Sequence, residues 1–246
     1  MASTTDKLIL LLAITFRVFI FNGSVKANGV ILEDIARKLD TATSVVAWAM
    51  ALQNGVAYMI APLTLLIMDT VGHRELCVVG GVLSGFGYIF CGFFMDHVWQ
   101  VFFAFVISGF GFGISALTCY IVLKRYFDNE SLPKVISVVF LFDYLGVAVL
   151  PLLLQYFIEH YGVANAMILF GAFVWNVVLS GVAIKNQPRE HNNIPKVEED
   201  KTTRNTRTLL FFKEKYSNVV TLFHHKNLIV LLVMEIVGYY MFTSWA

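Results

Sequence analysis

The 246-residue sequence has few charged residues, few prolines and few cysteines. Charged residues make up 14% of the chain and hydrophobic residues 58%, far from the balance of a soluble domain. The net charge of +1 provides no basic excess of the kind that binds nucleic acid. The three cysteines stand inside apolar runs, so neither a disulfide framework nor a metal site is predicted. With a mean hydropathy of +0.71, the composition predicts a protein whose solvent is lipid.

Long apolar runs dominate the chain, and a helix needs about 20 apolar residues to span a membrane. Arg17 interrupts the first run, which argues against the rival interpretation of that run as a cleavable signal peptide. We therefore predict an all-α membrane protein. The predicted spans are Leu8–Leu32, Ala42–Met68, Leu76–Met95, Val98–Leu123, Val135–Ile158, Val163–Ile184 and Leu228–Trp245.

The loops predict the orientation, because Lys and Arg concentrate in cytoplasmic loops. With the N-terminus inside, 14 of the 18 Lys and Arg residues fall in inner segments and 2 in outer ones. The N-terminus is therefore predicted to be cytoplasmic.

One connection is much longer than the others. Residues 185–226 are highly charged and contain Pro188 and Pro195, a composition typical of a mobile linker. We predict a six-helix bundle over 1–184, a cytoplasmic linker over 185–226 and a seventh transmembrane helix over 227–246. That layout is typical of a transporter with two six-helix halves, so the seventh helix would begin an incomplete second bundle.

Glycines gather in the third and fourth spans. Gly109, Gly111 and Gly113 superficially resemble a nucleotide-binding loop, but no strand precedes them. Small residues in lipid allow helices to approach closely, so we expect these glycines to serve helix packing.

The turn after the second span reads Asp69-Thr70-Val71-Gly72-His73-Arg74. It resembles the Asp-Arg-X-Gly-Arg-Arg turn of the major facilitator superfamily, in which acidic and basic groups clamp the cytoplasmic side. By that resemblance, Asp69, Gly72 and Arg74 form a cytoplasmic gating turn. Thr70 and His73 replace basic residues of the motif, so the clamp is expected to be weaker.

Longer strings extend the resemblance over nearly the whole chain, and together they are similar to the N-terminal half of the monocarboxylate transporter family. The strings are Met68-Asp69-Thr70-Val71-Gly72-His73-Arg74, Val79-Gly80-Gly81-Val82-Leu83-Ser84-Gly85, Arg125-Tyr126-Phe127, Leu150-Pro151-Leu152-Leu153-Leu154-Gln155-Tyr156, His160-Tyr161-Gly162 and Leu169-Phe170-Gly171.

The resemblance implies a six-helix N-terminal major-facilitator bundle followed by a seventh transmembrane helix. It also implies proton-coupled symport of a small organic acid across the plasma membrane, with no covalent step, no cofactor besides the proton and a single-pass chaperone as a possible partner. Two family features are missing: the acidic-Gly-Gly-Trp signature before the first span, and the paired arginines where Asp128-Asn129-Glu130-Ser131 stands. These departures leave the substrate open.

Charged residues inside the spans are expensive unless they are paired or hydrated. By the resemblance, Lys26 is the helix-one lysine that binds substrate and proton, and Asn22 is assigned to the same path. Alternatively, Lys26 extends to the outer interface, since Leu32 is about 9 Å along the helix. Glu235 is either a proton site or an interface residue.

Arg17 and Asp143 are not features of that family. Their depths from the cytoplasmic face are about 14 and 12 Å, so we expect a buried ion pair on the path.

Two other classes of function compete with a transporter. A seven-helix receptor needs an outer N-terminus, against the loop charges. A non-transporting truncated isoform or membrane subunit that acts through partner binding is the alternative, since the chain provides one helix of a second bundle.

Overall fold

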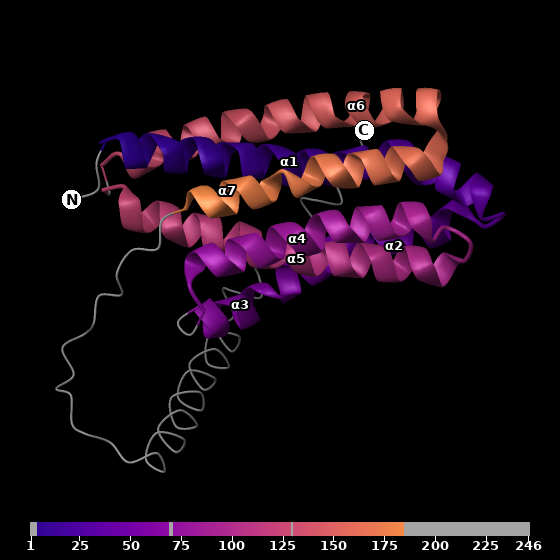
Figure 1. Ribbon diagram of the computed structural model, residues 1–246, viewed down its shortest axis with the longest axis horizontal. Helices are drawn as coiled ribbons and strands as arrows, with labels where there is room; N and C mark the ends of the chain where they lie inside the picture. The colour runs from indigo at the N-terminus through magenta and orange to yellow at the C-terminus, as the bar shows by residue number, and fades with distance from the viewer. Residues whose placement is uncertain (1–3, 69–70, 129, 185–246) are drawn as a thin grey trace, which may run out of the picture. The chain divides into compact units, whose positions relative to one another are not determined.

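The computed structural model of the chain describes residues 4–68, 71–128 and 130–184. These ranges contain helices and no strand (Figure 1). The helices are α1 (Thr4–Lys38), α2 (Thr43–Met59), α3 (Ala61–Met68), α4 (His73–Phe93), α5 (Val98–Tyr126), α6 (Leu132–Trp175) and α7 (Val177–Ala183).

Within the described ranges, five helical segments are long and apolar enough to cross a membrane. They are Thr5–Lys38, Thr43–Leu65, His73–Phe93, Val98–Tyr126 and Leu132–Ala183. The last one has 52 residues and covers both the fifth and the sixth predicted spans. The prediction of an all-α membrane protein is confirmed. The predicted linker over 185–226 and the seventh span, Leu228–Trp245, lie outside the described residues.

Gly162 divides α6 into two helical segments. Its backbone has φ 77° and ψ 162°, a combination that is essentially restricted to glycine. The chain reverses direction at this end of the bundle, and the returning segment continues into α7 (Figure 1). The reversal at Gly162 falls between Ile158, where the fifth predicted span ends, and Val163, where the sixth begins.

Two helix boundaries differ from the prediction. The second predicted span is divided at Ile60 into α2 and α3; Pro62 follows this break, and a proline has no N–H to donate within a helix. The first helix continues beyond Leu32 to Lys38. Arg37 pairs with Asp34 in its last turns, and basic side chains there interact favourably with the helix dipole.

Glycines allow α5 to contact both α4 and α2. A Cβ atom on Gly80 of α4 would lie 2.7 Å from the carbonyl oxygen of Gly111 of α5. A Cβ atom on Gly113 would overlap the carbonyl oxygen of Ala57 of α2. Because backbone atoms line both contacts, only glycine fits, and the predicted packing role is confirmed.

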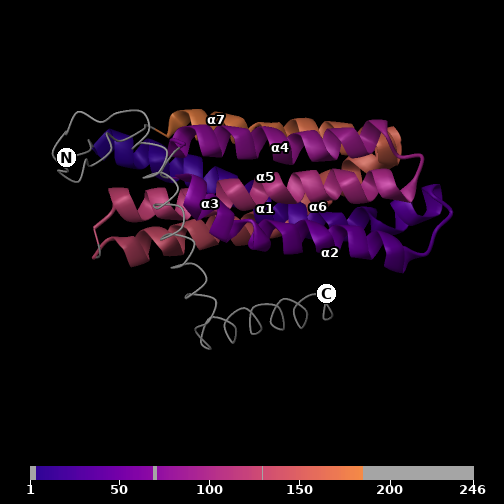
Figure 2. The same cartoon turned by 90° about the horizontal axis from the view of Figure 1, so that it is seen from below.

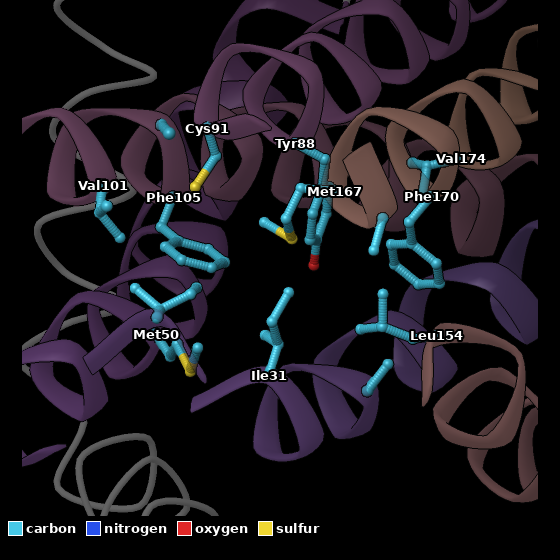
Figure 3. Close-up of a cluster of buried hydrophobic side chains, with 14 of the residues drawn as sticks. Ile31, Met50, Tyr88, Cys91, Val101, Phe105, Leu154, Met167, Phe170 and Val174 are labelled. Carbon is cyan, nitrogen blue, oxygen red and sulfur yellow. The ribbon is translucent and has the colours of Figure 1, made fainter. Parts of the chain in front are cut away.

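The largest buried cluster has Tyr88 of α4 near its centre (Figure 3). The Tyr88 ring packs edge-to-face against Phe105 of α5 and Phe170 of α6, with ring centroids 5.9 and 5.4 Å apart. The cluster joins α1, α2, α4, α5, both segments of α6 and the start of α7. α1 packs mainly on α6, and α2 packs mainly on α5. In Figure 2, α2 lies on one side of the bundle, and α4 and α7 lie on the other.

Candidate functional site

Two glycines bring the backbones of α1 and α6 into contact. A Cβ atom on Gly23 of α1 would lie 2.5 Å from the carbonyl oxygen of Gly146. A Cβ atom on Gly146 would overlap the carbonyl oxygen of Phe19. Side chains that flank this contact, which we call the α1–α6 crossing, are therefore held close together.

Asn22 and Asp143 are two polar side chains at the α1–α6 crossing. Asn22 directly precedes Gly23, and Asp143 is three positions before Gly146, on the same helix face. The Asn22 amide hydrogen-bonds to the Asp143 carboxyl group. The Oδ1 atom of Asp143 is buried and accepts no hydrogen bond. A buried carboxylate oxygen without a partner is costly, so the crossing holds an acid whose charge is only partly compensated.

Tyr120 extends the polar surroundings of Asp143, and Tyr58 in turn interacts with Tyr120. Tyr120 of α5 has Asp143 and Tyr58 of α2 among its electrostatic neighbours. Both phenol side chains are exposed, by 38% at Tyr120 and 51% at Tyr58. We call Asn22, Tyr58, Tyr120 and Asp143 the crossing site. Its members come from α1, α2, α5 and α6, and neither α4 nor α7 contributes to it.

Lys26 lies one helical turn beyond Asn22, on the same face of α1. Its side chain is half-buried. The next charged residue on this helix is Glu33, about 10 Å farther along the axis. Lys26 is thus the cation that α1 adds next to the crossing site, and its role in binding stays a prediction.

The predicted ion pair between Arg17 and Asp143 is wrong. Arg17 is 2% exposed, and its Nε atom donates to Ser180 Oγ at 3.1 Å. Its Nη2 atom donates to the carbonyl oxygens of Cys77 at 2.8 Å and Val177 at 3.0 Å. Arg17 therefore joins α1 to α4 and α7 and is not part of the crossing site.

The guanidinium of Arg17 lies beside the break between α6 and α7. α6 ends at Trp175, and α7 begins at Val177, whose carbonyl oxygen accepts from Arg17. A guanidinium has five N–H donors and satisfies several acceptors at once. Cys77 and Cys119 lie nearby with their sulfur atoms 3.9 Å apart, and all three cysteines are free and buried, as predicted.

A buried polar ring, formed by Asn28, Gln53, Tyr88 and Ser108, was missed by the sequence analysis. Asn28 Nδ2 donates to Gln53 Oε1 at 2.6 Å, and Tyr88 Oη donates to Asn28 Oδ1 at 3.0 Å. Gln53 Nε2 donates to Tyr88 Oη at 3.1 Å and to Ser108 Oγ at 2.9 Å. The ring links α1, α2, α4 and α5. Isolated polar residues within apolar spans, such as Asn28 and Gln53, could have suggested this ring from the sequence.

The predicted gating turn is described only in part. Asp69 lies outside the described residues. Gly72 is the N-cap of α4, with extended backbone, and Arg74 is exposed in the first turn of that helix. The clamping role of these residues stays a prediction.

Sequence comparison identifies relatives that are named as transporters. Residues 12–246 match the model of the Major Facilitator Superfamily. Monocarboxylate transporter 14 of Mus musculus is 27% identical over 180 residues, which are 72% of this chain and 35% of the relative. Monocarboxylate transporter 2 of Homo sapiens is 21% identical over 215 residues, which are 84% of this chain and 45% of the relative. The chain spans about a third of the length of the first relatives it matches.

Among solved structures, the chain is similar to the crystal structure of a peptide transporter, POT, in complex with sulfate. The TM-score is 0.63 at 18% sequence identity, over 92% of this chain and 46% of that one. At this identity the likeness shows the fold alone. The chain therefore belongs to the major facilitator superfamily, and it is a multi-pass membrane protein whose relatives in that superfamily are monocarboxylate transporters.

Proposed function

We propose that this chain forms one half of a transporter that moves a small monocarboxylate and a proton together across the plasma membrane. The names of the relatives, monocarboxylate transporters 14, 11 and 2, support this substrate class. Transport requires that the organic acid be bound, carried and released, and no covalent step is involved. The proton is the coupling ion.

The observation that carries the proposal is a lysine beside an acid–amide pair within an apolar bundle. Charged groups inside a membrane bundle are rare and mark substrate or ion pathways. The ammonium group of Lys26 has three N–H donors and meets a substrate carboxylate as a point charge. Asn22 lies one turn away from Lys26 on the same side of α1 and interacts with Asp143 of α6. The carboxyl group of Asp143 is therefore a titratable group next to the anion.

Replacing Lys26 tests this role directly. In a transporter that contains this bundle together with a second one, Lys26→Gln is expected to abolish proton-driven uptake of labelled lactate, while surface expression stays normal. Lys38→Gln is the matched control, because Lys38 is an exposed lysine at the end of the same helix. Uptake that survives Lys26→Gln would instead favour the interpretation that Lys26 extends to the membrane interface.

A single bundle supplies only one wall of a path that runs between two bundles. Tyr58 and Tyr120 of the crossing site are exposed in the described helices, which is compatible with such a wall. The 246-residue chain alone is therefore expected not to transport, and a membrane subunit that acts through partner binding is the second candidate. Liposomes that hold the purified chain under an imposed pH gradient test this. Saturable accumulation of lactate would contradict the expectation and favour an assembled dimer.

The orientation and the partner complete the proposal. The excess of Lys and Arg in one set of loops supports a cytoplasmic N-terminus. An epitope tag at Met1 should become accessible only after the cells are permeabilised. The resemblance to monocarboxylate transporters suggests a single-pass chaperone as a partner, which co-purification from plasma membranes would detect.

A further inference from the structure

Asp143 has a feature that the binding of an anion at Lys26 does not explain. The Asn22 side chain interacts with the carboxyl group, whereas Oδ1 is buried and accepts no hydrogen bond. Arg17, which stands at a similar depth, is held by Ser180 and by backbone carbonyls and does not compensate the acid. An acid in this setting is stabilised when it loses its charge, because an ionised oxygen without a partner is costly in an apolar interior.

We propose that the Asp143 carboxyl group takes up and releases the proton that accompanies the substrate, an inference that rests on the proposed function. Protonation forms one O–H bond on the carboxylate and removes its charge. The proton comes from water at the crossing site on one side of the membrane and returns to water on the other. Asn22 is the positioning residue, because its amide can donate to the carboxylate and its carbonyl oxygen can accept from the acid.

Space favours a proton over other cations. Oδ1 is buried, and the backbones of α1 and α6 already touch at Gly23 and Gly146. A substrate ammonium group or a metal cation would need its own volume and further oxygen ligands. A proton adds no volume and binds to an oxygen that is already present.

The groups around Asp143 are compatible with a neutral acid. Asn22 from α1 is uncharged, and Tyr120 from α5 adds a phenol that interacts with Asp143. Lys26, one turn beyond Asn22, is the charge that α1 adds on this face. The carboxyl group of Asp143 in the crossing site thus has the ammonium group of Lys26 next to the site.

The charges of Lys26 and Asp143 couple the proton to the substrate. Without ligands, the positive charge of the Lys26 ammonium and the negative charge of the Asp143 carboxylate sum to zero. With a monocarboxylate at Lys26 and a proton on Asp143, the sum is zero again, whereas either ligand alone leaves one net charge. An uncompensated charge at the centre of a membrane helix is disfavoured roughly a hundredfold on insertion scales. The transporter is therefore expected to change between its inward and outward orientations only when it is empty or when it holds both ligands. This rule gives one proton for each anion.

Infrared spectroscopy of the purified chain in lipid nanodiscs tests the protonation. Lowering the pH is expected to produce the carbonyl band of a protonated carboxylic acid while exposed aspartates, with an ordinary pKa near 3.9, are still ionised. Asp143→Asn should remove the band and Asn22→Ala should shift its frequency. Asp96→Asn, at an exposed aspartate between α4 and α5, should leave it unchanged. Asp143→Glu keeps an acid at the site if the asparagine variant fails to fold.

Two infrared outcomes would overturn the inference. One is a band that is missing in the folded native chain or persists in folded Asp143→Asn. The other is a band that sodium suppresses at constant pH, since the site would then bind a metal cation. Transport gives a separate readout: Asp143→Asn leaves the loaded state neutral and the empty state charged. It should therefore keep exchange of labelled lactate and lose net uptake about a hundredfold. Equal loss of both activities also contradicts the inference. If the unmodified transporter shows no proton-driven uptake, the proposed function fails, and the infrared result still reports on Asp143.

Discussion

Ser180→Ala probes the buried guanidinium of Arg17. The substitution removes the acceptor of the Arg17 Nε hydrogen bond, which is 3.1 Å long and buried. Hydrogen bonds to charged groups contribute about 1.5–3 kcal/mol in proteins, while interhelical pairs in membranes average about 0.6 kcal/mol and reach about 1.7. Because Arg17 is only 2% exposed, water cannot replace the lost acceptor. We expect a coupling energy near the upper end of the membrane range, about 1–2 kcal/mol.

A double-mutant cycle isolates this interaction. Arg17→Met keeps an extended side chain while it removes three hydrogen bonds and one buried charge, so its own effect mixes opposing contributions. In the Arg17→Met background, Ser180→Ala should cost little, because no N–H of residue 17 then needs an acceptor. The difference between the two effects of Ser180→Ala is the coupling energy.

The measurement is the Tm of the purified chain in detergent. For proteins of 150–250 residues, 1 kcal/mol corresponds to about 2–4 °C, so Ser180→Ala alone should lower the Tm by roughly 2–8 °C. A cycle between Arg17→Met and Asp143→Asn is the comparison, and there the effects should add, since the two side chains do not pair. Equal effects of Ser180→Ala in both backgrounds, or strong coupling to Asp143, would refute this account of Arg17.

Two further predictions concern helix packing. Gly111→Ala should destabilise the bundle by about 1–3 kcal/mol or more, because the new Cβ atom would overlap the backbone of α4. Gly29→Ala, with no atom within 4 Å of the new Cβ, should be neutral or stabilising by up to about 1 kcal/mol; equal Tm values for the two variants would contradict the packing argument. Gln53→Leu should lower stability by about 2 kcal/mol through three lost hydrogen bonds, detected as a lower Tm, whereas Gln155→Leu, whose side-chain hydrogen bond to Glu159 is exposed, should change it less.

Hydropathy and loop length predicted the described spans because lipid demands about 20 apolar residues per crossing, whatever their packing. The role of Gly111 and Gly113 was also predictable, since glycine in an apolar span has few other uses. Helix ends were less predictable. The continuation of α1 from Leu32 to Lys38 depends on charged residues that can occupy either a helix or a loop.

The partners of polar residues could not be predicted in the same way. Counting residues gave Arg17 and Asp143 similar depths, but depth says nothing about the direction of a side chain around the helix axis. That direction sends Arg17 towards Ser180 and leaves Asp143 with Asn22. The buried polar ring illustrates the same limit, because Asn28 and Gln53 meet only once α1 and α2 have been oriented.

The reversal at Gly162 has a consequence for how the protein enters the membrane. No polar loop separates the two segments of α6: helical geometry ends at Tyr161 and resumes at Val163. There is no hydrophilic stretch that would have to be translocated separately, so the two segments should insert as one helical hairpin. Any other residue at position 162 would have to adopt a conformation that costs about 1–3 kcal/mol. Substitutions of Gly162 are therefore expected to act during membrane insertion, and to produce misinserted chains before any transport could be measured.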